Sequence, residues 1–279
     1  MTEAGRVEEF QETVWRYYDA QGRHTLPWRL PEADGRFDPY RILVSEVMLQ
    51  QTQVARVIPK YIDFLEQFPT VQALARSGLG EVLTAWQGLG YNRRAKFLWQ
   101  AAQLVESAYN GEFPRDQKEL TCLPGVGMNT AGAVVAYAFN RPAVFIETNI
   151  RTVFIHHFFN DRENVHDKEV AEQVATTLPR GDKAEVRLWY WALMDYGAYL
   201  KQTVGNKSRA SKSYVRQSPF AGSRRAVRGA VIRSLSRAGQ GLSTDELAKI
   251  ITDPRLPDVL QDLQAEGLVR KRVKQYWLA

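Results

Sequence analysis

Helical periodicity runs through this chain from Val7 to Leu200 and leaves little room for a sheet. Apolar residues recur at three- and four-residue spacing, whereas strict alternation is scarce before the C-terminal end. Proline and glycine residues divide the pattern into segments, and such residues commonly end helices. The pattern predicts helices over residues 7–19, 39–51, 54–67, 79–86, 93–109, 117–122, 129–139, 149–159, 168–177 and 183–200. We therefore expect an all-α body, because amphipathic helices bury their apolar faces against one another.

A glycine turn joins two of the predicted helices. Residues 123–127 read LPGVG, and Gly125 and Gly127 allow backbone conformations that a side chain hinders. The amides of this turn and of the next helix N-terminus would face outward and suit an anion. A phosphate bound in this way is held without reference to base identity. A tight turn without any ligand explains the pentapeptide alone equally well.

Positive charge is concentrated in one part of the chain. The net charge is +6, and the stretch from Lys201 to Arg237 contains ten Lys or Arg residues and no Asp or Glu. The rest of the chain has more acidic than basic residues. A basic stretch beside an acidic body favours a polyanionic partner, and nucleic acid is the commonest one. A solvated basic linker is the alternative. We expect DNA contacts from Lys207, Arg209 and Lys212.

Composition divides the chain into three parts. Residues 1–200 form the helical body, and residues 201–222 are polar, basic and poor in aliphatic side chains, as in a linker. Residues 223–279 predict a small domain. Its helices are expected over residues 225–238, from a capping box at Ser243 and Glu246, and over 258–266, before an alternating stretch at 268–278. Three helices and a β-wing predict a winged helix-turn-helix domain.

The distribution of charge in this small domain argues against a role for its third helix in reading DNA. That helix carries acidic residues and no base-reading Arg or Lys, whereas the wing is basic. The acidic residues are Asp258, Asp262 and Glu266, and the basic ones are Arg270, Lys271, Arg272 and Lys274. The wing is therefore the better DNA contact. A module that docks another protein fits the pattern equally well.

Composition also excludes several classes of protein. The one cysteine, Cys122, rules out an internal disulfide and a four-cysteine metal site, and we expect it in the core. No apolar run approaches the roughly 20 residues that span a bilayer, and the N-terminus is polar and acidic. These features predict a cytoplasmic protein without a metal site.

Five short motifs occur in order along the helical body. They lie at residues 26–29 (LPWR), 39–40 (PY), 45–52 (SEVMLQQT), 88–91 (GLGY) and 123–127 (LPGVG). Together they resemble the helix-hairpin-helix DNA glycosylases, most closely the MutY family of adenine DNA glycosylases. The resemblance implies the helix-hairpin-helix glycosylase fold with two helical subdomains. It also implies a base-excision repair enzyme that binds double-stranded DNA, flips out a mispaired or damaged nucleotide and cleaves its N-glycosidic bond. We expect a monomer that acts at the nucleoid.

The resemblance also implies roles for particular residues. Gln51 and Tyr91 match the family's intercalating positions, which fill the space that a flipped nucleotide leaves. Glu46 matches the acid that protonates the leaving base, and its apolar helix neighbours would raise its pKa. Asn149 matches an asparagine that orients a carboxylate or phosphate. Further residues expected at the DNA are Leu123, Gly125, Val126, Gly127 and Arg93.

The sequence departs from the family pattern in ways that bear on the chemistry. Glu147 stands where the family has an aspartate, and its extra methylene displaces the carboxylate by about 1 Å. Asn129 stands where bifunctional relatives have a Schiff-base lysine, so water is the expected nucleophile. The four-cysteine loop of an iron–sulfur cluster and the domain that reads 8-oxoguanine are both missing, so no cofactor is expected. A monovalent cation at the hairpin carbonyls is compatible with the sequence.

These features predict a monofunctional DNA glycosylase without lyase activity, with adenine as the first base to test. Its expected catalytic set is Glu46, Glu147, Asn149 and Asn129. An enzyme that removes thymine or uracil from G·T or G·U mispairs fits the same scaffold. So does a DNA-binding protein that kept the fold and lost the chemistry, because Glu147 departs from the family pattern.

Overall fold

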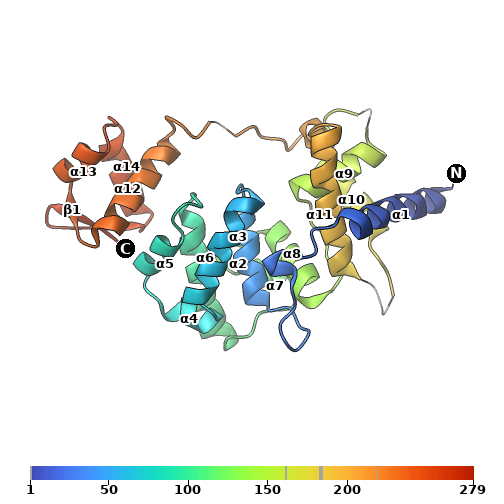
Figure 1. Ribbon diagram of the computed structural model, residues 1–279, viewed down its shortest axis with the longest axis horizontal. Helices are drawn as coiled ribbons and strands as arrows, with labels where there is room; N and C mark the ends of the chain where they lie inside the picture. The colour runs from blue at the N-terminus through green and yellow to red at the C-terminus, as the bar shows by residue number, and fades with distance from the viewer. Residues whose placement is uncertain (1, 161, 182–184, 218) are drawn as a thin grey trace. The chain divides into compact units, whose positions relative to one another are not determined.

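The computed structural model describes residues 2–160, 162–181, 185–217 and 219–279 (Figure 1). The chain divides into two compact units, each assembled from segments that are distant in sequence. The first unit comprises residues 1–46, 114–122 and 126–216, and the second comprises residues 47–113, 123–125 and 217–279. None of the helices in the described ranges is long and apolar enough to cross a lipid bilayer.

The first unit is built around two buried helices, α8 and α11. Its helical segments are α1 (Glu3–Gln21), η1 (Pro27–Arg29), α2 (Pro39–Leu49, up to Glu46), α7 (Gln117–Leu120), α8 (Met128–Phe139), α9 (Thr148–Phe158), α10 (Asp167–Thr177), α11 (Val186–Thr203) and η2 (Lys207–Ala210). Helix α11 packs against α9, α8 and α1. Small residues let α8 approach its neighbours closely: a Cβ at Gly132 would lie 2.9 Å from the Cβ of Phe145. Helices α8, α9 and α1 thus share one packing partner, α11, at the centre of the unit.

The second unit begins with four helices, one of which the sequence pattern did not predict. They are α3 (Val54–Gln67), α4 (Val71–Arg76), α5 (Leu79–Ala85) and α6 (Arg93–Tyr109). The unpredicted helix α4 is capped by Thr70, whose hydroxyl accepts a hydrogen bond from the amide of Ala73 at 3.1 Å. It buries Val71 and Leu74. Six residues are too few for a helical period to stand out in a sequence.

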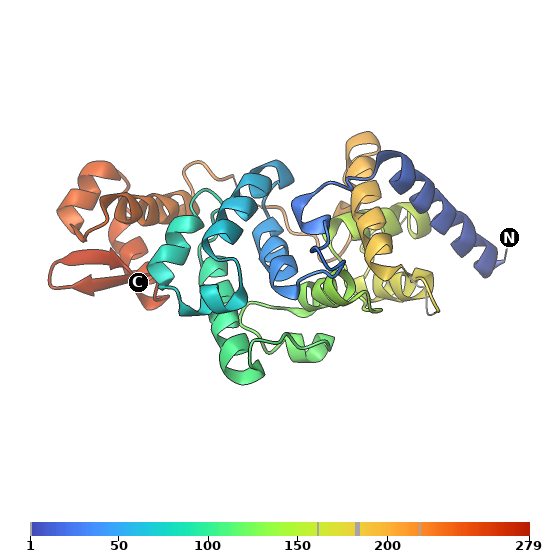
Figure 2. The same ribbon diagram turned by 60° about the horizontal axis from the view of Figure 1, so that its bottom comes forward.

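The last part of the second unit is a small domain of three helices and a three-stranded sheet. Its elements are α12 (Arg224–Ala238), β1 (Leu242–Ser243), α13 (Thr244–Ile250), α14 (Leu256–Ala265), β2 (Val269–Arg272) and β3 (Gln275–Leu278). The sheet is antiparallel with order β1-β3-β2, and β2 and β3 form a terminal hairpin (Figure 2). The capping box at the start of α13 is confirmed, because Ser243 and Glu246 exchange backbone-to-side-chain hydrogen bonds. Helix α12 and strand β3 pack on α5.

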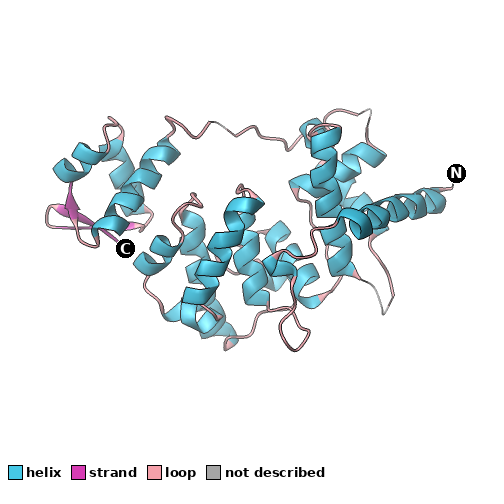
Figure 3. Cartoon of the chain, viewed as in Figure 1, coloured by secondary structure: helices cyan, strands magenta, loops and turns pink. Residues whose placement is uncertain are grey.

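Helices dominate both units, which confirms the predicted all-α body, yet several boundaries differ from the sequence pattern (Figure 3). The helix expected over residues 39–51 ends at Leu49, and Gln51 has a φ of 54° in the left-handed region. The helix expected over 183–200 begins at Val186, and residues 183 and 184 lie outside the described residues. Cys122 is exposed rather than buried in the core, because α7 ends at Leu120 and the cysteine lies in the turn that follows.

The segment expected to be a linker is ordered over its first half. Helix α11 continues to Thr203. Beyond it, Val165 exchanges backbone hydrogen bonds with residues at and just after the end of η2. The amide of Val165 donates to the carbonyl of Ala210, and the amide of Lys212 donates to the carbonyl of Val165, both at 3.0 Å. The basic residues 207–212 are therefore fixed on the first unit.

Candidate active site

Glu46 lies in the last turns of α2, where apolar side chains enclose it. Ile42, Leu43 and Met48 around it are almost fully buried, and Ser45 is tied to the carbonyl of Ile42 at 2.8 Å. The Glu46 side chain keeps partial access to solvent. Burial raises its pKa well above the ordinary value, and the nearby charge of Glu147 raises it further, while Arg29 opposes both effects. Glu46 is therefore a carboxyl group that keeps its proton to a higher pH than an ordinary glutamate does.

Glu147 occupies the N-cap position of α9 without capping it. Its backbone is extended, and its side chain accepts no hydrogen bond from the first turn of the helix. Burial raises the pKa of Glu147 above its ordinary value, and the positive charges of Lys201 and Arg151 offset only part of that rise. The described part of the chain offers neither Glu46 nor Glu147 a hydrogen bond or ion pair to its carboxyl group. Two unpaired, electrostatically coupled carboxyl groups in protein surroundings are typical of a catalytic pair.

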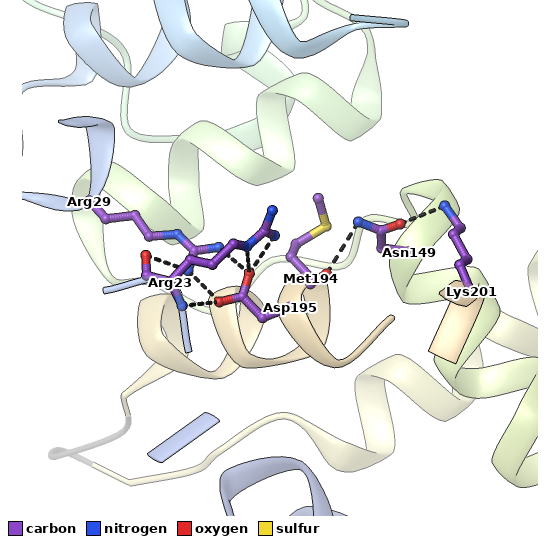
Figure 4. A network of polar contacts seen from close by, with 6 residues as sticks. All are labelled: Arg23, Arg29, Asn149, Met194, Asp195 and Lys201. Carbon is purple, nitrogen blue, oxygen red and sulfur yellow. Dashed lines mark hydrogen bonds and ion pairs between the residues drawn. The ribbon is translucent and has the colours of Figure 1, made fainter. Parts of the chain in front are cut away.

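Asn149 and Lys201 form a polar link beside Glu147 (Figure 4). The ammonium group of Lys201 donates to the Asn149 side-chain oxygen at 2.5 Å, and the Asn149 amide donates to the carbonyl of Met194 at 3.2 Å. Gly197 of α11 permits this approach, since a Cβ there would lie 2.4 Å from the Asn149 carbonyl oxygen. The amide of Asn149 is thus held in one orientation, with a positive charge next to it.

Asp195 organises a second polar cluster that reaches the site through Arg29. Arg29 donates to both carboxylate oxygens of Asp195, at 2.8 and 2.9 Å, and Arg23 donates to the same group through its side chain and its amide (Figure 4). Asp195 is almost fully buried, and Arg29 also lies over the ring of Trp191. These contacts give Asp195 a structural role between the two arginines. Because Asp195 balances its charge, Arg29 reduces but does not cancel the raised pKa of Glu46.

Asn129 is exposed in the first turn of α8 and faces the segment before α9. Its side-chain oxygen accepts a hydrogen bond from the amide of Ile146 at 3.1 Å. The side chain offers a carboxamide and no amine. It therefore supplies a polar group to the site without a nucleophile for a Schiff base.

Gln51 and Tyr91 come together in the second unit. Both residues have positive φ angles, 54° and 48°, and the Tyr91 hydroxyl donates to the Gln51 side-chain oxygen at 3.0 Å. Both side chains are exposed. A non-glycine residue in the left-handed region is uncommon, and two in contact mark a locally constrained site. The two predicted intercalating residues therefore form one projecting pair.

Arg94 holds the two loops that carry this pair. Its guanidinium group donates to carbonyl oxygens of both loops, and its charge lies 5.5 Å from the centre of the Tyr91 ring. The acceptors are the carbonyls of Val47, Met48, Gln50, Leu89 and Gly90 and the hydroxyl of Thr52. Burial lowers the pKa of Arg94 to about 10, so it stays charged at neutral pH.

The backbone of the glycine turn at residues 123–127 agrees with the prediction at Gly125 but not at Gly127. Gly125 has a φ of 76°, and a Cβ there would lie 2.6 Å from the Cβ of Phe97, so this position requires glycine. Gly127, in contrast, is extended with a φ of −87° and has open space around it, so its backbone does not require glycine. The side chains of Leu123 and Val126 are buried. Only the backbone of this turn is therefore free to meet a ligand.

The basic residues expected to contact DNA differ in the exposure of their side chains and in how far their charge is balanced within the protein. Arg209 and Lys212 are exposed near η2, and Lys207 is half-buried close enough to lower the pKa of His156. Arg93 in the second unit lies over the ring of Phe97 and 3.9 Å from Glu266. Part of the charge of Arg93 is therefore balanced within the protein.

The residues present do not fit an iron–sulfur cluster. The sequence has one cysteine, and within the described ranges no three His, Cys, Asp or Glu residues gather closely enough to hold a metal ion. Lys201 follows Gly197 and Ala198 in a stretch that contains no cysteine.

Three residues with clear roles in the geometry were not predicted from the sequence. They are Lys201, Arg29 and Arg94. Arg29 and Arg94 belong to the motifs LPWR and the basic helix after GLGY, so their position was visible but their partners were not. Lys201 appeared as one of ten basic residues, and only the fold distinguishes it from the others.

Comparison with known proteins shows what the chain is similar to. Residues 44–180 match the model of the HhH-GPD superfamily base excision DNA repair proteins. The matched segment of the chain thus has the pattern of this superfamily. Among curated proteins it is similar to the adenine DNA glycosylase of Mycolicibacterium smegmatis, with 39% identity over 182 residues, which are 65% of this chain and 60% of that protein.

Other relatives extend the comparison. The adenine DNA glycosylase of Homo sapiens is 39% identical over 156 residues, which are 54% of this chain and 28% of that protein. The chain spans about half the length of the curated relatives it matches, for example 46% of the adenine DNA glycosylase of Buchnera aphidicola subsp. Baizongia pistaciae.

Solved structures share the fold. A thermostable thymine-DNA glycosylase superposes with a TM-score of 0.59 at 26% identity, covering 70% of this chain and 87% of that one. A trapped endonuclease III–DNA intermediate superposes with a TM-score of 0.57 at 23% identity, covering 71% and 88%. The helix-hairpin-helix glycosylase fold predicted from the sequence is confirmed.

Proposed function

We propose that this protein is a monofunctional DNA glycosylase that hydrolyses the N-glycosidic bond of a flipped, mispaired adenine. The observation that carries the proposal is the pair Glu46 and Glu147. The two carboxyl groups are coupled, their pKa values are raised, and neither is hydrogen-bonded within the described residues. The similarity to several adenine DNA glycosylases supports adenine as the base.

The proposed reaction uses the two carboxyl groups in opposite protonation states. Glu46, with the higher pKa, donates its proton to the base while the bond between the base and the sugar breaks. The bonding electron pair leaves with the base, and positive charge builds on the sugar. Ionised Glu147 stabilises that charge. A water molecule then attacks the sugar carbon and releases a proton, which restores Glu46.

The residues around the pair have supporting roles in this scheme. Lys201 favours the ionised form of Glu147, because its charge offsets part of the rise in pKa that burial causes. Asn149, fixed by Lys201 and by the carbonyl of Met194, orients the sugar or its phosphate. Asn129 contacts the base or sugar through its carboxamide and forms no covalent link. Water is therefore the nucleophile, and the enzyme acts without an iron–sulfur cluster.

Binding to duplex DNA follows from three further groups of residues. Gln51 and Tyr91 enter the duplex and replace the flipped nucleotide. Backbone amides at Gly125 and Gly127 bind a phosphate, while Leu123 and Val126 anchor the turn through their buried side chains. Positive charge from Lys207, Arg209, Lys212 and Arg93 attracts the backbone without sequence preference. We place this activity in a monomer at the nucleoid.

A single experiment tests the function. Labelled duplexes would carry adenine opposite guanine or 8-oxoguanine, thymine or uracil opposite guanine, and common deaminated or oxidised bases. Single-turnover cleavage is measured with and without hot alkali. We expect product from the adenine duplexes only after alkali, and a loss of about 10²–10⁴-fold in Glu46→Gln. Product without alkali would contradict the monofunctional mechanism, and no product on any duplex would contradict the enzyme itself.

One observation favours a second candidate, the removal of thymine or uracil opposite guanine. The thermostable thymine-DNA glycosylase shares the fold at 26% identity, and Asn129 presents a carboxamide that matches the edge of a pyrimidine. In the same panel, this candidate requires cleavage of the G·T or G·U duplexes in preference to the adenine duplexes.

A further inference from the structure

Tyr137 of α8 lies among the candidate catalytic residues but has no part in the proposed mechanism. Its ring stacks on that of Trp191, with the ring centres 5.7 Å apart, and stands nearly perpendicular to the ring of Phe145, 5.9 Å away. Phe145 precedes Glu147 by two residues, and Trp191 carries the guanidinium group of Arg29 over its ring. All five residues belong to the first unit. The two rings therefore fix the Tyr137 side chain against the elements that carry the site.

The charges around Tyr137 agree with this position. Burial raises the pKa of its phenol well above the ordinary value, and the negative charges of Glu46 and Glu147 raise it further, while Arg29 opposes them. Charges interact strongly over short distances in a poorly solvated interior. Because its pKa is raised, the phenol keeps its proton at neutral pH and is a hydrogen-bond donor.

The hydroxyl group of Tyr137 has no hydrogen-bond partner among the residues that the structure describes. The residue is 4% exposed. The unpaired side-chain atoms that are sealed from solvent do not include the Tyr137 oxygen, so the small exposed fraction of the residue contains the hydroxyl group. Buried hydroxyl groups are usually hydrogen-bonded, and an exception calls for an explanation. Tyr190, which stacks on Phe145, shows the usual case, since its hydroxyl donates to the carbonyl of Ala143 at 2.5 Å.

We propose that the Tyr137 hydroxyl binds the flipped base, donating a hydrogen bond to one ring nitrogen of adenine while Glu46 protonates another. The inference rests on the proposed function, because it assumes that a flipped base enters beside Glu46. Adenine suits two donors, since its N3 and N7 atoms are separate acceptors. The phenol keeps its own proton throughout, so it holds the base in place while Glu46 transfers one.

A cycle of substitutions in the protein and in the base tests this contact. Affinity is measured for duplexes whose target, opposite guanine, is adenine or its 1-deaza, 3-deaza or 7-deaza analogue. Each target sugar carries a fluorine at C2′, which disfavours positive charge on the sugar and blocks cleavage. We expect Tyr137→Phe to weaken the adenine duplex by about threefold to tenfold, the weight of one hydrogen bond. It should have no effect on the one analogue that lacks the bound nitrogen, because the two changes then remove the same interaction. An equal effect on every duplex, or none on any, would overturn the inference.

Two further measurements distinguish this role from a merely structural one. The hydroxyl makes no hydrogen bond within the described protein, so Tyr137→Phe should leave the unfolding temperature unchanged, whereas loss of an internal contact would lower it. The single-turnover rate below saturation should fall by the same factor as the affinity, with both limbs of its pH profile in place. A moved limb would mean that the hydroxyl acts on a carboxyl group instead of the base, against the proposal. Tyr109→Phe, at a half-buried tyrosine of α6, is the matched control and should leave binding and rate unchanged.

The uncleavable duplexes also separate failure of this inference from failure of the proposed function. If the wild type excises no adenine, yet Tyr137→Phe weakens the adenine duplex and spares one deaza analogue, the proposed function is wrong and the contact stands. If the wild type excises adenine and Tyr137→Phe matches it in affinity and rate, the proposed function stands and the inference is overturned.

Discussion

The negative charge of Glu147 raises the pKa of Glu46. Because of this coupling, one proton shared by the pair settles on Glu46 and leaves Glu147 ionised, helped by the positive charge of Lys201. The fold thereby assigns an acid and an anion to two side chains of the same chemical type. Glycosidic bond cleavage requires that pair of states at the same pH.

Removing the charge of Glu147 should shift the basic limb of the pH–rate profile. In the proposed mechanism Glu46 acts when protonated, so activity should fall as the pH rises through its pKa. In Glu147→Gln the charge that raises this pKa is gone, so the basic limb should move to lower pH as the rate decreases. Single-turnover rates across pH measure the limb. Glu147→Asp retains the charge and should keep the limb in place, and an unmoved limb in Glu147→Gln would refute the coupling.

Removing the charge of Lys201 should shift the acidic limb instead. In the proposed mechanism Glu147 acts when ionised, so activity should fall as the pH drops through its pKa. Lys201 lowers that pKa, and Lys201→Met should therefore move the acidic limb to higher pH. The same substitution frees the Asn149 amide and should reduce the maximum rate. Lys168→Met, an exposed lysine of α10, provides the control and should leave both limbs unchanged.

Glu46→Gln should unfold at a higher temperature than the wild type in alkaline buffer. The pKa of Glu46 is raised in the folded state, so its stabilising effect is complete below the pKa of an unfolded glutamate, about 4.3. That stability is lost as the pH rises through the folded pKa. We expect a difference on the order of 1 kcal/mol above neutrality, closing toward acid pH. Thermal unfolding measures it, and Glu12→Gln on the exposed face of α1 should show no such trend.

Two glycines of one turn should respond differently to alanine. Gly125→Ala forces a side chain into the left-handed region and against Phe97, so we expect a loss of roughly 1–3 kcal/mol of unfolding free energy. Gly127→Ala meets no atom and should change stability by less than about 1 kcal/mol. Its methyl group would nevertheless occupy the space that a phosphate approaches, and affinity for undamaged duplex should fall. Urea titration and duplex binding separate the two effects, and normal binding by a folded Gly127→Ala would remove the turn from the DNA interface.

The sequence predicted those parts of the molecule that depend on local patterns. Residues 54–67 and 93–109 form helices with the expected bounds, because both carry a long apolar stripe. The capping box at Ser243 and Glu246 also depends on neighbours three residues apart, and it is present. The position of Glu46 followed from a motif within one helix, as did its raised pKa.

Features that depend on tertiary contacts escaped prediction. The contact of Lys201 with Asn149 joins residues 52 positions apart, and no local signal marks that lysine among its basic neighbours. Helix α2 was expected to include Gln51, since its residues are good helix formers, but the contacts of Arg94 with the carbonyls of Met48 and Gln50 favour a turn there. The open surroundings of Gly127 likewise become visible only once the chain is folded.

The contacts of Arg94 have a consequence for how this protein meets DNA. One guanidinium group ties the loop of Gln51 to the loop of Tyr91, so the two side chains have a single arrangement before any duplex arrives. Ordering two loops costs conformational entropy, and here that cost falls on folding rather than on binding. A scanning protein meets far more undamaged than damaged sites, and a preformed probe can test each of them without rearranging itself. If the proposed function is correct, one half-buried arginine would thus speed the search by fixing this probe before DNA binds.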